Sequence, residues 1–314
     1  MEALTARFAR DFAALWSRSE GPVGLAVSGG PDSLALLVLM HAAGCAPFAV
    51  ATVDHGLRAE AAAEAALVAR VCADLGVSHD TLTLSLPSGA GVQERARAAR
   101  YAALAEWAGR KGLGALVVAH HADDQAETVL MRLNRGAGVR GLAAMRARSA
   151  TPGAPHLPLL RPLLGWRREE LAAVVAEVGL VAVADPSNED PRFERVRVRS
   201  ALRDAAWLDR TAITESARHL AEADEAIEWA TAQCIAAIRR EEGVLVWRPD
   251  APRAIALRVL EAIVGEIGRS TPRGRELADW HDALRQGRTA TLAGVKGWSR
   301  DGEWRFAVTP PHRT

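Results

Sequence analysis

Short apolar runs alternate with longer amphipathic stretches through the first two thirds of the chain. The runs have the length of β-strands and the stretches have the length of helices, so the pattern predicts strands that alternate with helices. The predicted strands are Val23 to Val27, Phe48 to Val53, Thr81 to Leu84 and Leu116 to Ala119, and the helices after them begin at Leu34, Glu60, Val92 and His120. Such alternation indicates an α/β fold with a doubly wound, mainly parallel sheet and right-handed crossovers.

The pattern is less regular in the middle of the chain. Proline, alanine and arginine dominate from Ala147 to Pro162, which we expect to be irregular. A helix is predicted from Trp166 to Gly179, and Val181 to Val183 reads as a further strand. From Arg192 to Arg203 arginines alternate with valines, over too short a span to decide between strand and helix.

The character of the chain changes near Asp209, where a long amphipathic helix is predicted from Ile213 to Arg240. Three β-type runs and two helices of a smaller helical or α+β unit follow: Val244 to Trp247, Thr289 to Val295, Trp304 to Val308, Pro252 to Gly265 and Arg275 to Arg285. A chain of 314 residues is long enough for two domains. We therefore place one domain at residues 1–209 and a second, which includes the connecting helix, at residues 210–314.

Composition describes a globular protein, with 49% hydrophobic and 25% charged residues. No apolar run reaches the length of about 18 residues that a membrane helix needs. The first sixteen residues carry Glu2 and Asp11 and read as an amphipathic helix, not as a targeting segment. We expect a cytoplasmic protein without a membrane partner.

The three cysteines, Cys45, Cys72 and Cys234, lie far apart and show no C-x-x-C spacing. This favours small buried hydrophobic residues over a disulfide, a zinc site or a sulfur-transfer role.

Positive charge is concentrated although the net charge is only +1. No acidic residue occurs between Thr128 and Arg168, where eight arginines fall: Arg132, Arg135, Arg140, Arg146, Arg148, Arg161, Arg167 and Arg168. A local positive field of this kind favours a polyanionic partner.

The stretch Ser28-Gly29-Gly30-Pro31-Asp32-Ser33 joins the first predicted strand to the first helix. Glycines let the backbone approach an anion, the two serines add hydroxyl donors, and the N–H groups of the helix start point at the same place. The stretch therefore predicts a phosphate site. It lacks the lysine of a Walker A loop, which disfavours simple γ-phosphate hydrolysis.

Polar residues also follow the second and fourth strands, at Asp54-His55 and from His120 to Thr128. Strand ends of an open α/β sheet are site positions. Asp124 and Glu127 lie three apart on one helix and can both face the phosphate site. A carboxylate such as Asp32 beside phosphates repels them unless it binds Mg²⁺. Helix-start acids are the alternative interpretation, with Asp123 as the best cap.

Five further motifs occur in the order found in one family. They are Val53 to Arg58, Ala119 to Thr128, Arg135 to Gly138 with Gly141-Leu142, Arg161 to Leu164, and Asp185 to Asn188. Ser-Gly-Gly-x-Asp-Ser after a first strand resembles the PP-loop of the ATP pyrophosphatase superfamily, whose fold is Rossmann-like. With the other motifs, the chain resembles the tRNA(Ile)-lysidine synthases. The last hundred residues are similar to a short-form carboxyl-terminal domain in position and size only.

This resemblance implies a specific ligase reaction. ATP adenylates the 2-oxygen of the wobble cytidine in tRNA(Ile) with the anticodon CAU, and the ε-amine of free L-lysine then displaces AMP. The products are lysidine, AMP and pyrophosphate, and the implied cofactors are ATP and Mg²⁺. The first domain is then the catalytic domain, and the second is a tRNA-binding or supporting domain.

Carried onto this chain, the resemblance and the chemistry above nominate three groups of residues. The catalytic candidates are Asp32, Asp124 and Glu127, with Asp32 and Asp124 as Mg²⁺ ligands. The ATP-binding candidates are Ser28, Gly29, Gly30, Pro31, Asp32, Ser33, Asp54, His55 and His120. The substrate and tRNA candidates are Arg97, Arg100, Tyr101, Arg135, Arg140, Arg195, Arg197 and Arg199.

Other features of the sequence set limits on this interpretation. Adjacent histidines, His120 and His121, point in different directions and suit nucleotide or tRNA contact better than zinc. The family's Arg-Asn-x-Ile-Arg run is replaced by the segment Arg195 to Arg199, which loses the asparagine amide. Five tryptophans are expected in the core: Trp229, Trp247, Trp280, Trp298 and Trp304.

Two alternatives remain open. One is another PP-loop enzyme, either an amide-forming ligase or a tRNA 2-thiolation enzyme, which would need paired cysteines that the chain lacks. The other is a tRNA-binding homologue without activity, against which the intact Asp32, Asp124 and Glu127 argue. The sequence also leaves the oligomeric state open, a homodimer included.

Overall fold

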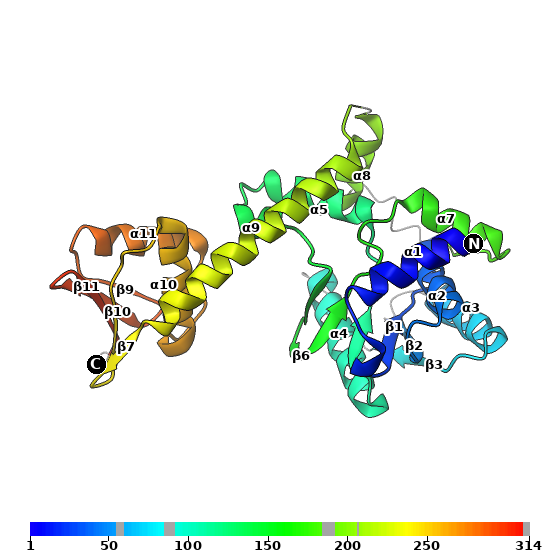
Figure 1. Cartoon of the computed structure of the whole chain (residues 1–314), viewed down its shortest axis with the longest axis horizontal. Coiled ribbons are helices and arrows are strands. Elements are labelled where there is room, and N and C mark those ends of the chain that lie inside the picture. Colours follow the sequence, from blue (N-terminus) through cyan, green and yellow to red (C-terminus); the bar gives the residue numbers. More distant parts are fainter. Residues whose placement is uncertain (55–59, 85–91, 184–191, 206, 310–314) are drawn as a thin grey trace. The chain divides into compact units, whose positions relative to one another are not determined.

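The computed structural model describes residues 1–54, 60–84, 92–183, 192–205 and 207–309 (Figure 1). The chain divides into two compact units, Met1–Ala221 and Glu222–Thr314. The long helix α9, Arg210–Ala236, begins in the first unit and ends in the second. The boundary between the two units therefore lies within α9, whereas the sequence predicted it at the first residue of this helix.

The first unit is built on a six-stranded sheet with the order β3-β2-β1-β4-β6-β5. Its strands are β1 Val23–Ala26, β2 Phe48–Asp54, β3 His79–Thr83, β4 Ala115–Val117, β5 Arg148–Thr151 and β6 Ala154–Leu160. All neighbouring pairs are parallel except β5 with β6. The predicted doubly wound, mainly parallel sheet is confirmed.

Helices cover both faces of this sheet, because alternate strand residues point to opposite sides. On one face the core contains Val23 and Leu25 together with apolar residues of α1 Glu2–Ala13, α2 Pro31–Ala43, α3 Glu60–Asp74 and α7 Arg168–Glu177. On the other face Ala26 packs with residues of α4 Val92–Lys111. A Cβ on Gly24 would lie 2.5 Å from the Trp107 ring of α4, so the close approach of strand and helix requires glycine there.

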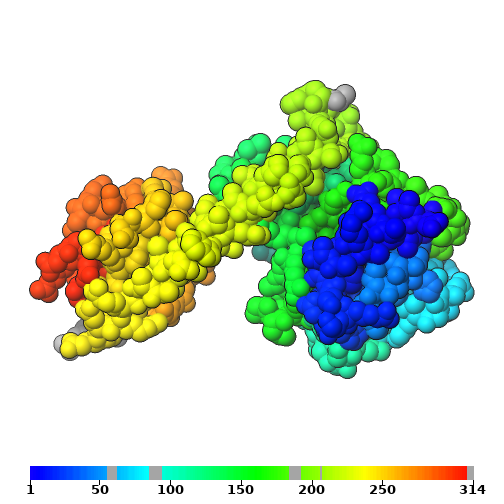
Figure 2. Space-filling model, viewed as in Figure 1, coloured from blue at the N-terminus to red at the C-terminus, as the bar shows by residue number. Residues whose placement is uncertain are grey.

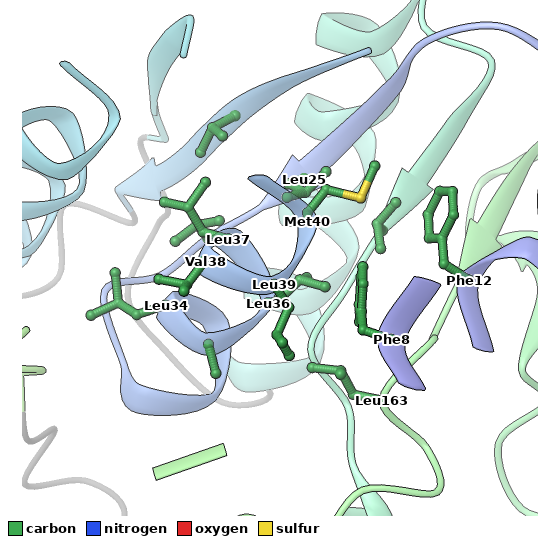
Figure 3. Packing of buried hydrophobic residues seen from close by; sticks show 14 of the residues in the cluster. Phe8, Phe12, Leu25, Leu34, Leu36, Leu37, Val38, Leu39, Met40 and Leu163 are labelled. Atoms are coloured by element: carbon green, nitrogen blue, oxygen red, sulfur yellow. The ribbon is translucent and has the colours of Figure 1, made fainter. Parts of the chain in front are cut away.

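Helix α2 is the central helix of the first unit. Every residue from Ser33 to Met40 is buried, because the sheet covers one side while α1 and α7 cover the others. Figure 3 shows Phe8 and Phe12 of α1 in the same cluster as Leu36, Leu39 and Leu163. In the space-filling view the amino-terminal residues, α1 among them, form the blue surface of this unit (Figure 2). This packing fixes α2, and hence the loop before it, against the sheet.

Two segments differ from the sequence-based expectation, and a third, which the pattern left undecided, is settled by the structure. The proline-rich stretch expected to be irregular forms β5 and β6, which pair across a register shift at Ala150/Thr151. The alternating arginine segment forms helix α8, Glu194–Asp204. Val181 to Val183 forms no strand, although the Val183 N–H donates to the Gly29 carbonyl at 3.2 Å.

The remaining helices of the first unit are η1 Arg18–Glu20, α5 Ala122–Leu133 and α6 Val139–Leu142. Helix α5 packs against α8, and the Thr214 hydroxyl of α9 donates to the Ala122 carbonyl at 3.2 Å. Arg146 donates to the Ala221 carbonyl at 2.6 Å. The start of α9 is thus tied to the start of α5.

The second unit is an antiparallel sheet with two helices, which agrees with the predicted α+β domain. The strand order is β7-β8-β11-β10-β9. Its elements are β7 Arg239–Glu241, β8 Val244–Trp247, α10 Arg253–Ile267, α11 Gly274–Arg285, β9 Ala290–Leu292, β10 Val295–Arg300 and β11 Glu303–Val308. No helix in the described part of either unit is long and apolar enough to cross a membrane.

The tryptophans of the second unit fall into two groups. Trp247, Trp280 and Trp304 are buried in its core, as predicted. Trp229 is 69% exposed on α9, so its predicted core position is wrong. Trp298 is only partly buried, and the Lys296 ammonium lies 5.6 Å from its ring centroid. A helix with one covered face can expose an apolar residue that local pattern assigns to the core.

Candidate functional site

A pocket of about 440 Å³ opens at the carboxyl ends of β1 and β4. The chain passes from β1 to β2 on one side and later places β4 on the other side of β1, so the loops after β1 and β4 diverge at this point. Such a switch point is where open α/β sheets bind ligands. The loop of residues 28–33, here called the phosphate loop, and the start of α5 form its walls.

Hydrogen bonds within the phosphate loop give it a defined shape. The Ser28 N–H donates to Ser33 Oγ at 3.1 Å, and Ser33 Oγ donates to the Gly30 carbonyl at 2.9 Å. Gly29 has a φ of 88°, a conformation that favours glycine. Gly30 caps α2 without a side-chain hydrogen bond, and Pro31 is its first residue. The first turn of α2 therefore offers its N–H groups to an anion in the pocket.

His121 lies between two carboxylates behind the phosphate loop. Its Nε2 is 3.4 Å from Asp32 Oδ2 and 3.5 Å from Asp124 Oδ2. The ring is only 2% exposed. Asp124 also accepts from the His121 N–H at 3.2 Å, so it caps α5 and faces the pocket at once. Asp32 and Asp124, which come from different helices, are brought together around one imidazole.

Charge decides the protonation of His121. Burial alone would lower its pKa, but the carboxylates of Asp123, Asp32 and Asp124 outweigh burial and raise the pKa to about 10. Its Nδ1 lies 3.2 Å from the Asp123 backbone nitrogen and 3.6 Å from the Asp123 carboxylate. A neutral ring would accept from that nitrogen, whereas a protonated ring donates to the carboxylate. The raised pKa favours the protonated ring.

His120, the adjacent residue, has the opposite character. It lines the pocket, and its Nδ1 is buried without a hydrogen-bond partner. Burial lowers its pKa to about 4 against the opposing charge of Asp124, and the cations Arg161, Arg100 and Arg97 lower it further. His120 is therefore neutral at physiological pH and presents a free ring nitrogen.

The predicted arginine–tyrosine group on α4 is split between pocket and core. Arg100 lines the pocket, and burial lowers its pKa. Tyr101 is 2% exposed and belongs to the core under the sheet, while the Arg97 guanidinium lies 5.2 Å from the centre of its ring. Only Arg100 of the three contacts the pocket.

Glu127 binds arginines and does not line the pocket. It is 1% exposed and receives Arg199 Nε at 2.6 Å and Arg199 Nη2 at 3.2 Å, with Arg195 Nε at 3.5 Å. Both arginines come from α8 and line the pocket. Glu127 thus fixes two cations at the rim, since a bidentate carboxylate sets the plane of a guanidinium.

Asp32 and Asp124 suit a hard cation such as Mg²⁺. Asp32 Oδ1 is buried without a hydrogen-bond partner, as a ligand-binding oxygen would be, and carboxylate oxygens are the ligands that Mg²⁺ prefers. Among the described residues no three Asp, Glu, His or Cys side chains form a complete ligand set. A cation here would depend on phosphate oxygens or water for its other ligands, which is typical of Mg²⁺ in nucleotide sites.

Ten of the nominated residues line the pocket: Ser28, Gly30, Pro31, Asp32, Ser33, Arg100, His120, Asp124, Arg195 and Arg199. Eight described ones do not line it: Asp54, Arg97, Tyr101, Glu127, Arg135, Arg140, Arg197 and Gly29, whose φ of 88° shapes the loop. His55 and the Asp185-to-Asn188 motif lie outside the described residues.

The acid-free arginine stretch mostly binds the protein itself. Arg132 donates to the Gly141 and Ala144 carbonyls, and Arg161 donates to the Arg146 carbonyl and to Ser149. Arg135 pairs with Glu194 of α8. These cations therefore bind oxygens of the same stretch and one carboxylate from α8.

Sequence reasoning missed Glu64 and Arg168 as pocket residues and the link between Glu127 and α8. Arg168 is the first residue of α7, and its N–H donates to Asp123 Oδ2 at 3.1 Å. The alternative interpretation, in which Asp123 caps its own helix, is therefore wrong: His121 is the N-cap residue of α5, and the Asp123 carboxylate binds the start of α7. No local sequence signal reports such long-range contacts.

Comparisons with known proteins agree with this geometry. A family model described as the PP-loop domain matches residues 4–206. The tRNA(Ile)-lysidine synthase of Novosphingobium aromaticivorans is 56% identical over 310 residues, which cover 98% of this chain and 94% of the relative. That of Zymomonas mobilis is 46% identical over 308 residues, which cover 95% and 92%.

Solved structures add information on the fold alone. The U34-tRNA thiolase of Methanococcus maripaludis has a TM-score of 0.55 at 16% identity, over 69% of this chain and 78% of the thiolase. The relatives with high identity cover both units, and the matched PP-loop region contains the phosphate loop and the carboxylates around His121. The chain belongs to the tRNA(Ile)-lysidine synthase family of PP-loop proteins.

Proposed function

We propose that the chain attaches L-lysine to carbon 2 of the wobble cytidine in tRNA(Ile) with the anticodon CAU. ATP first adenylates the 2-oxygen with release of pyrophosphate, and the ε-amine of lysine then displaces AMP. The observation that carries the proposal is one pocket at the sheet's switch point that contains both the phosphate loop and the carboxylates Asp32 and Asp124. Family membership supports it.

The pocket offers what adenylation of a weakly electrophilic carbonyl requires. The first turn of α2 binds the phosphates through its N–H groups, and Arg100, Arg195 and Arg199 place positive charge around the departing pyrophosphate. Because Glu127 fixes Arg199, that cation is preorganised and does not need to reorient during the reaction.

We assign the Mg²⁺ that accompanies ATP to Asp32 and Asp124. When bound, the metal neutralises phosphate charge and polarises the phosphoryl group. Neutral His120 offers its free ring nitrogen to the nucleotide or to the base. The cytoplasmic location and the role of the second unit in binding tRNA remain predictions.

A 2-thiolation reaction fits this chain less well. Cys45, Cys72 and Cys234 do not line the pocket. Burial raises the pKa of Cys72 to about 11, which leaves it a protonated thiol. A sulfur-transfer mechanism needs thiolates or a cluster at the nucleotide, and the described structure offers neither.

Incorporation of labelled lysine tests the proposal. The chain is incubated with ATP, Mg²⁺, labelled lysine and a tRNA(Ile) transcript with the anticodon CAU, beside the same transcript with its wobble cytidine changed to uridine. We expect label in the first transcript alone. Consumption of ATP without label in either transcript would contradict the assignment.

A further inference from the structure

We propose that Arg210 and Asp123 are positioning residues that hold the His121 imidazole with its Nε2 between Asp32 and Asp124. The activity measurements below rest on the proposed function, whereas the structural measurement does not. The inference concerns residues away from the pocket, on the side of His121 opposite to the phosphate loop.

A series of hydrogen-bond and ion-pair contacts connects these residues. Arg210 Nη1 donates to Asp123 Oδ1 at 2.7 Å. The other oxygen of Asp123 accepts the Arg168 N–H at 3.1 Å and lies 3.6 Å from His121 Nδ1. His121 Nε2 then reaches both pocket carboxylates. Arg210 is the first residue of α9, so three elements meet at one carboxylate.

Burial makes this arrangement more than a surface ion pair. Asp123 is 8% exposed and His121 is 2% exposed, so neither side chain exchanges its partners for water at low cost. The Arg210 side chain is 32% exposed and closes the arrangement on its outer side. A buried carboxylate held at both oxygens has one orientation available to it.

The site needs a fixed imidazole for two reasons. Asp32 and Asp124 both approach one nitrogen, and two carboxylates this near repel each other unless a donor lies between them. An imidazole ring can also turn over about its side-chain torsion, which places ring carbons where the nitrogens were. A partner that binds the far nitrogen prevents this. Asp123 is that partner: its backbone nitrogen lies 3.2 Å from Nδ1, within hydrogen-bond distance, and its carboxylate lies 3.6 Å from Nδ1, within ion-pair distance. A carboxylate orients a histidine in a similar way in metal and catalytic sites.

The chain provides a matched control in its second unit. Arg253 is the first residue of α10 and donates to Asp282 at 3.1 Å and 3.2 Å, and Asp282 Oδ1 lies 2.8 Å from His281 Nδ1. This is the same order of arginine, aspartate and histidine, but its arginine and aspartate side chains are 53% and 50% exposed, and it does not line the nucleotide pocket.

The first test measures the steady-state rate of AMP formation at saturating tRNA while the ATP concentration is varied. The variants are Asp123→Asn, Arg210→Gln, Arg210→Lys and Arg253→Gln. We expect kcat to fall about 10- to 100-fold for the first two, which is typical for residues that orient a ligand side chain. The KM for ATP should change less than about threefold because the loop still binds the phosphates. Arg210→Lys keeps the single charged contact and should restore most of kcat, and Arg253→Gln should match the wild type.

Nitrogen NMR of histidine rings gives the second test, with the His121 signals assigned by their loss in His121→Gln. Arg210→Gln should shift the ring resonances of His121 and leave those of His281 in place, and Arg253→Gln should do the reverse. Unchanged His121 resonances in Arg210→Gln would overturn the proposal. So would a loss of kcat that tracks a lowered melting temperature and that lysine does not restore.

The NMR comparison requires no turnover. A wild-type chain that forms no AMP would overturn the proposed function alone, and the ring resonances would still decide whether Arg210 and Asp123 position His121.

Discussion

At the scale of single residues, Asp32 combines two properties. It stands in the first turn of α2 and lines the pocket, and its Oδ1 is buried without a hydrogen-bond partner. A carboxylate in that position costs free energy unless a cation binds it. Its unpaired oxygen supports the proposed assignment of Mg²⁺ to Asp32.

We expect Asp32→Ala to lower the rate of AMP formation by at least about a hundredfold. Without this ligand the proposed Mg²⁺ is lost, and the negative charge on the leaving pyrophosphate is no longer neutralised. Binding of tRNA should stay within about twofold, since Asp32 lies at the nucleotide and not at the exposed arginines. Quenched-flow or thin-layer assays of AMP and filter binding of tRNA measure the two effects. Loss of tRNA binding in this variant would show that Asp32 has a structural role.

The partner of the Glu127 carboxylate depends on which helix packs against α5. The spacing of Glu127 from Asp124 predicts a shared face, and both residues do come from the same side of α5. The Glu127 carboxylate nevertheless binds Arg199 and Arg195 instead of facing the pocket, because α8 packs against α5 and brings these two cations to it. Its contribution to the site passes through those arginines.

At the scale of elements, a single carboxylate ties β3 to α4. Trp107 Nε1 of α4 donates to Asp80 Oδ2 of β3 at 3.0 Å, and Lys111 Nζ lies 2.9 Å from the same oxygen. The hydrogen bond from Trp107, followed by the one from Lys111, lowers the pKa of Asp80. The ionised side chain is therefore bound more tightly in the folded than in the unfolded chain.

This predicts a pH-dependent contribution to stability. Because the folded pKa is depressed, the stabilisation is fully present above the unfolded value of about 3.9 and is lost as the pH falls through the lower folded value. Asp80→Asn should lower the free energy of unfolding by about 1 kcal/mol at pH 7, a small value because Asp80 is partly exposed. The difference should shrink below pH 4 in urea titrations.

The exposed Asp74 at the end of α3 provides the comparison for this measurement. Asp74→Asn should leave stability unchanged at both pH values. A constant difference between wild type and Asp80→Asn across the acid range would contradict the role given to the ionised carboxylate.

Strands β5 and β6 mark the limit of element prediction from pattern. Pro155 and Pro158 argue against a strand in the middle of a sheet, since proline donates no ladder hydrogen bond. The parallel pairing of β6 with β4 is confined to Leu159 and Leu160, beyond both prolines, and the β5 pairing is irregular next to them. Most of the pairing of β6 is with β5, and β4 adds an edge that exists only in the folded sheet.

At the scale of the whole molecule, charge distribution matters more than net charge. The chain carries a formal charge of only +1, yet arginines occur on α6 and α8, two helices that pack against α5. Arg195 is 44% exposed at the pocket, and Arg140 and Arg197 are exposed in the same unit. Binding to a tRNA backbone through such residues releases counter-ions and weakens with added salt.

We expect the affinity for tRNA(Ile) to fall linearly on a logarithmic plot against salt concentration. Arg140→Gln and Arg197→Gln should each reduce the steepness of that line by about 0.7 to 0.9, the value for one lost phosphate contact. The rate at saturating tRNA should not change. Arg10→Gln on α1, whose side chain is 75% exposed, should leave the line as it is; equal slopes in all variants would remove these arginines from the tRNA contact.

The sequence by itself determined the sheet class, the phosphate loop, its strand-to-helix setting and the family, because hydrophobic periodicity and short motifs are local properties of the chain. Only the tertiary structure decided that His121 lies between Asp32 and Asp124. It also decided that Glu127 binds an arginine of α8 and that Asp123 binds the first residues of α7 and α9. These contacts join residues up to 89 positions apart, from Asp32 to His121, and their existence depends on which elements pack together. Packing depends on the whole sheet and all of its helices, whereas a hydrophobic pattern predicts the structure of one segment at a time.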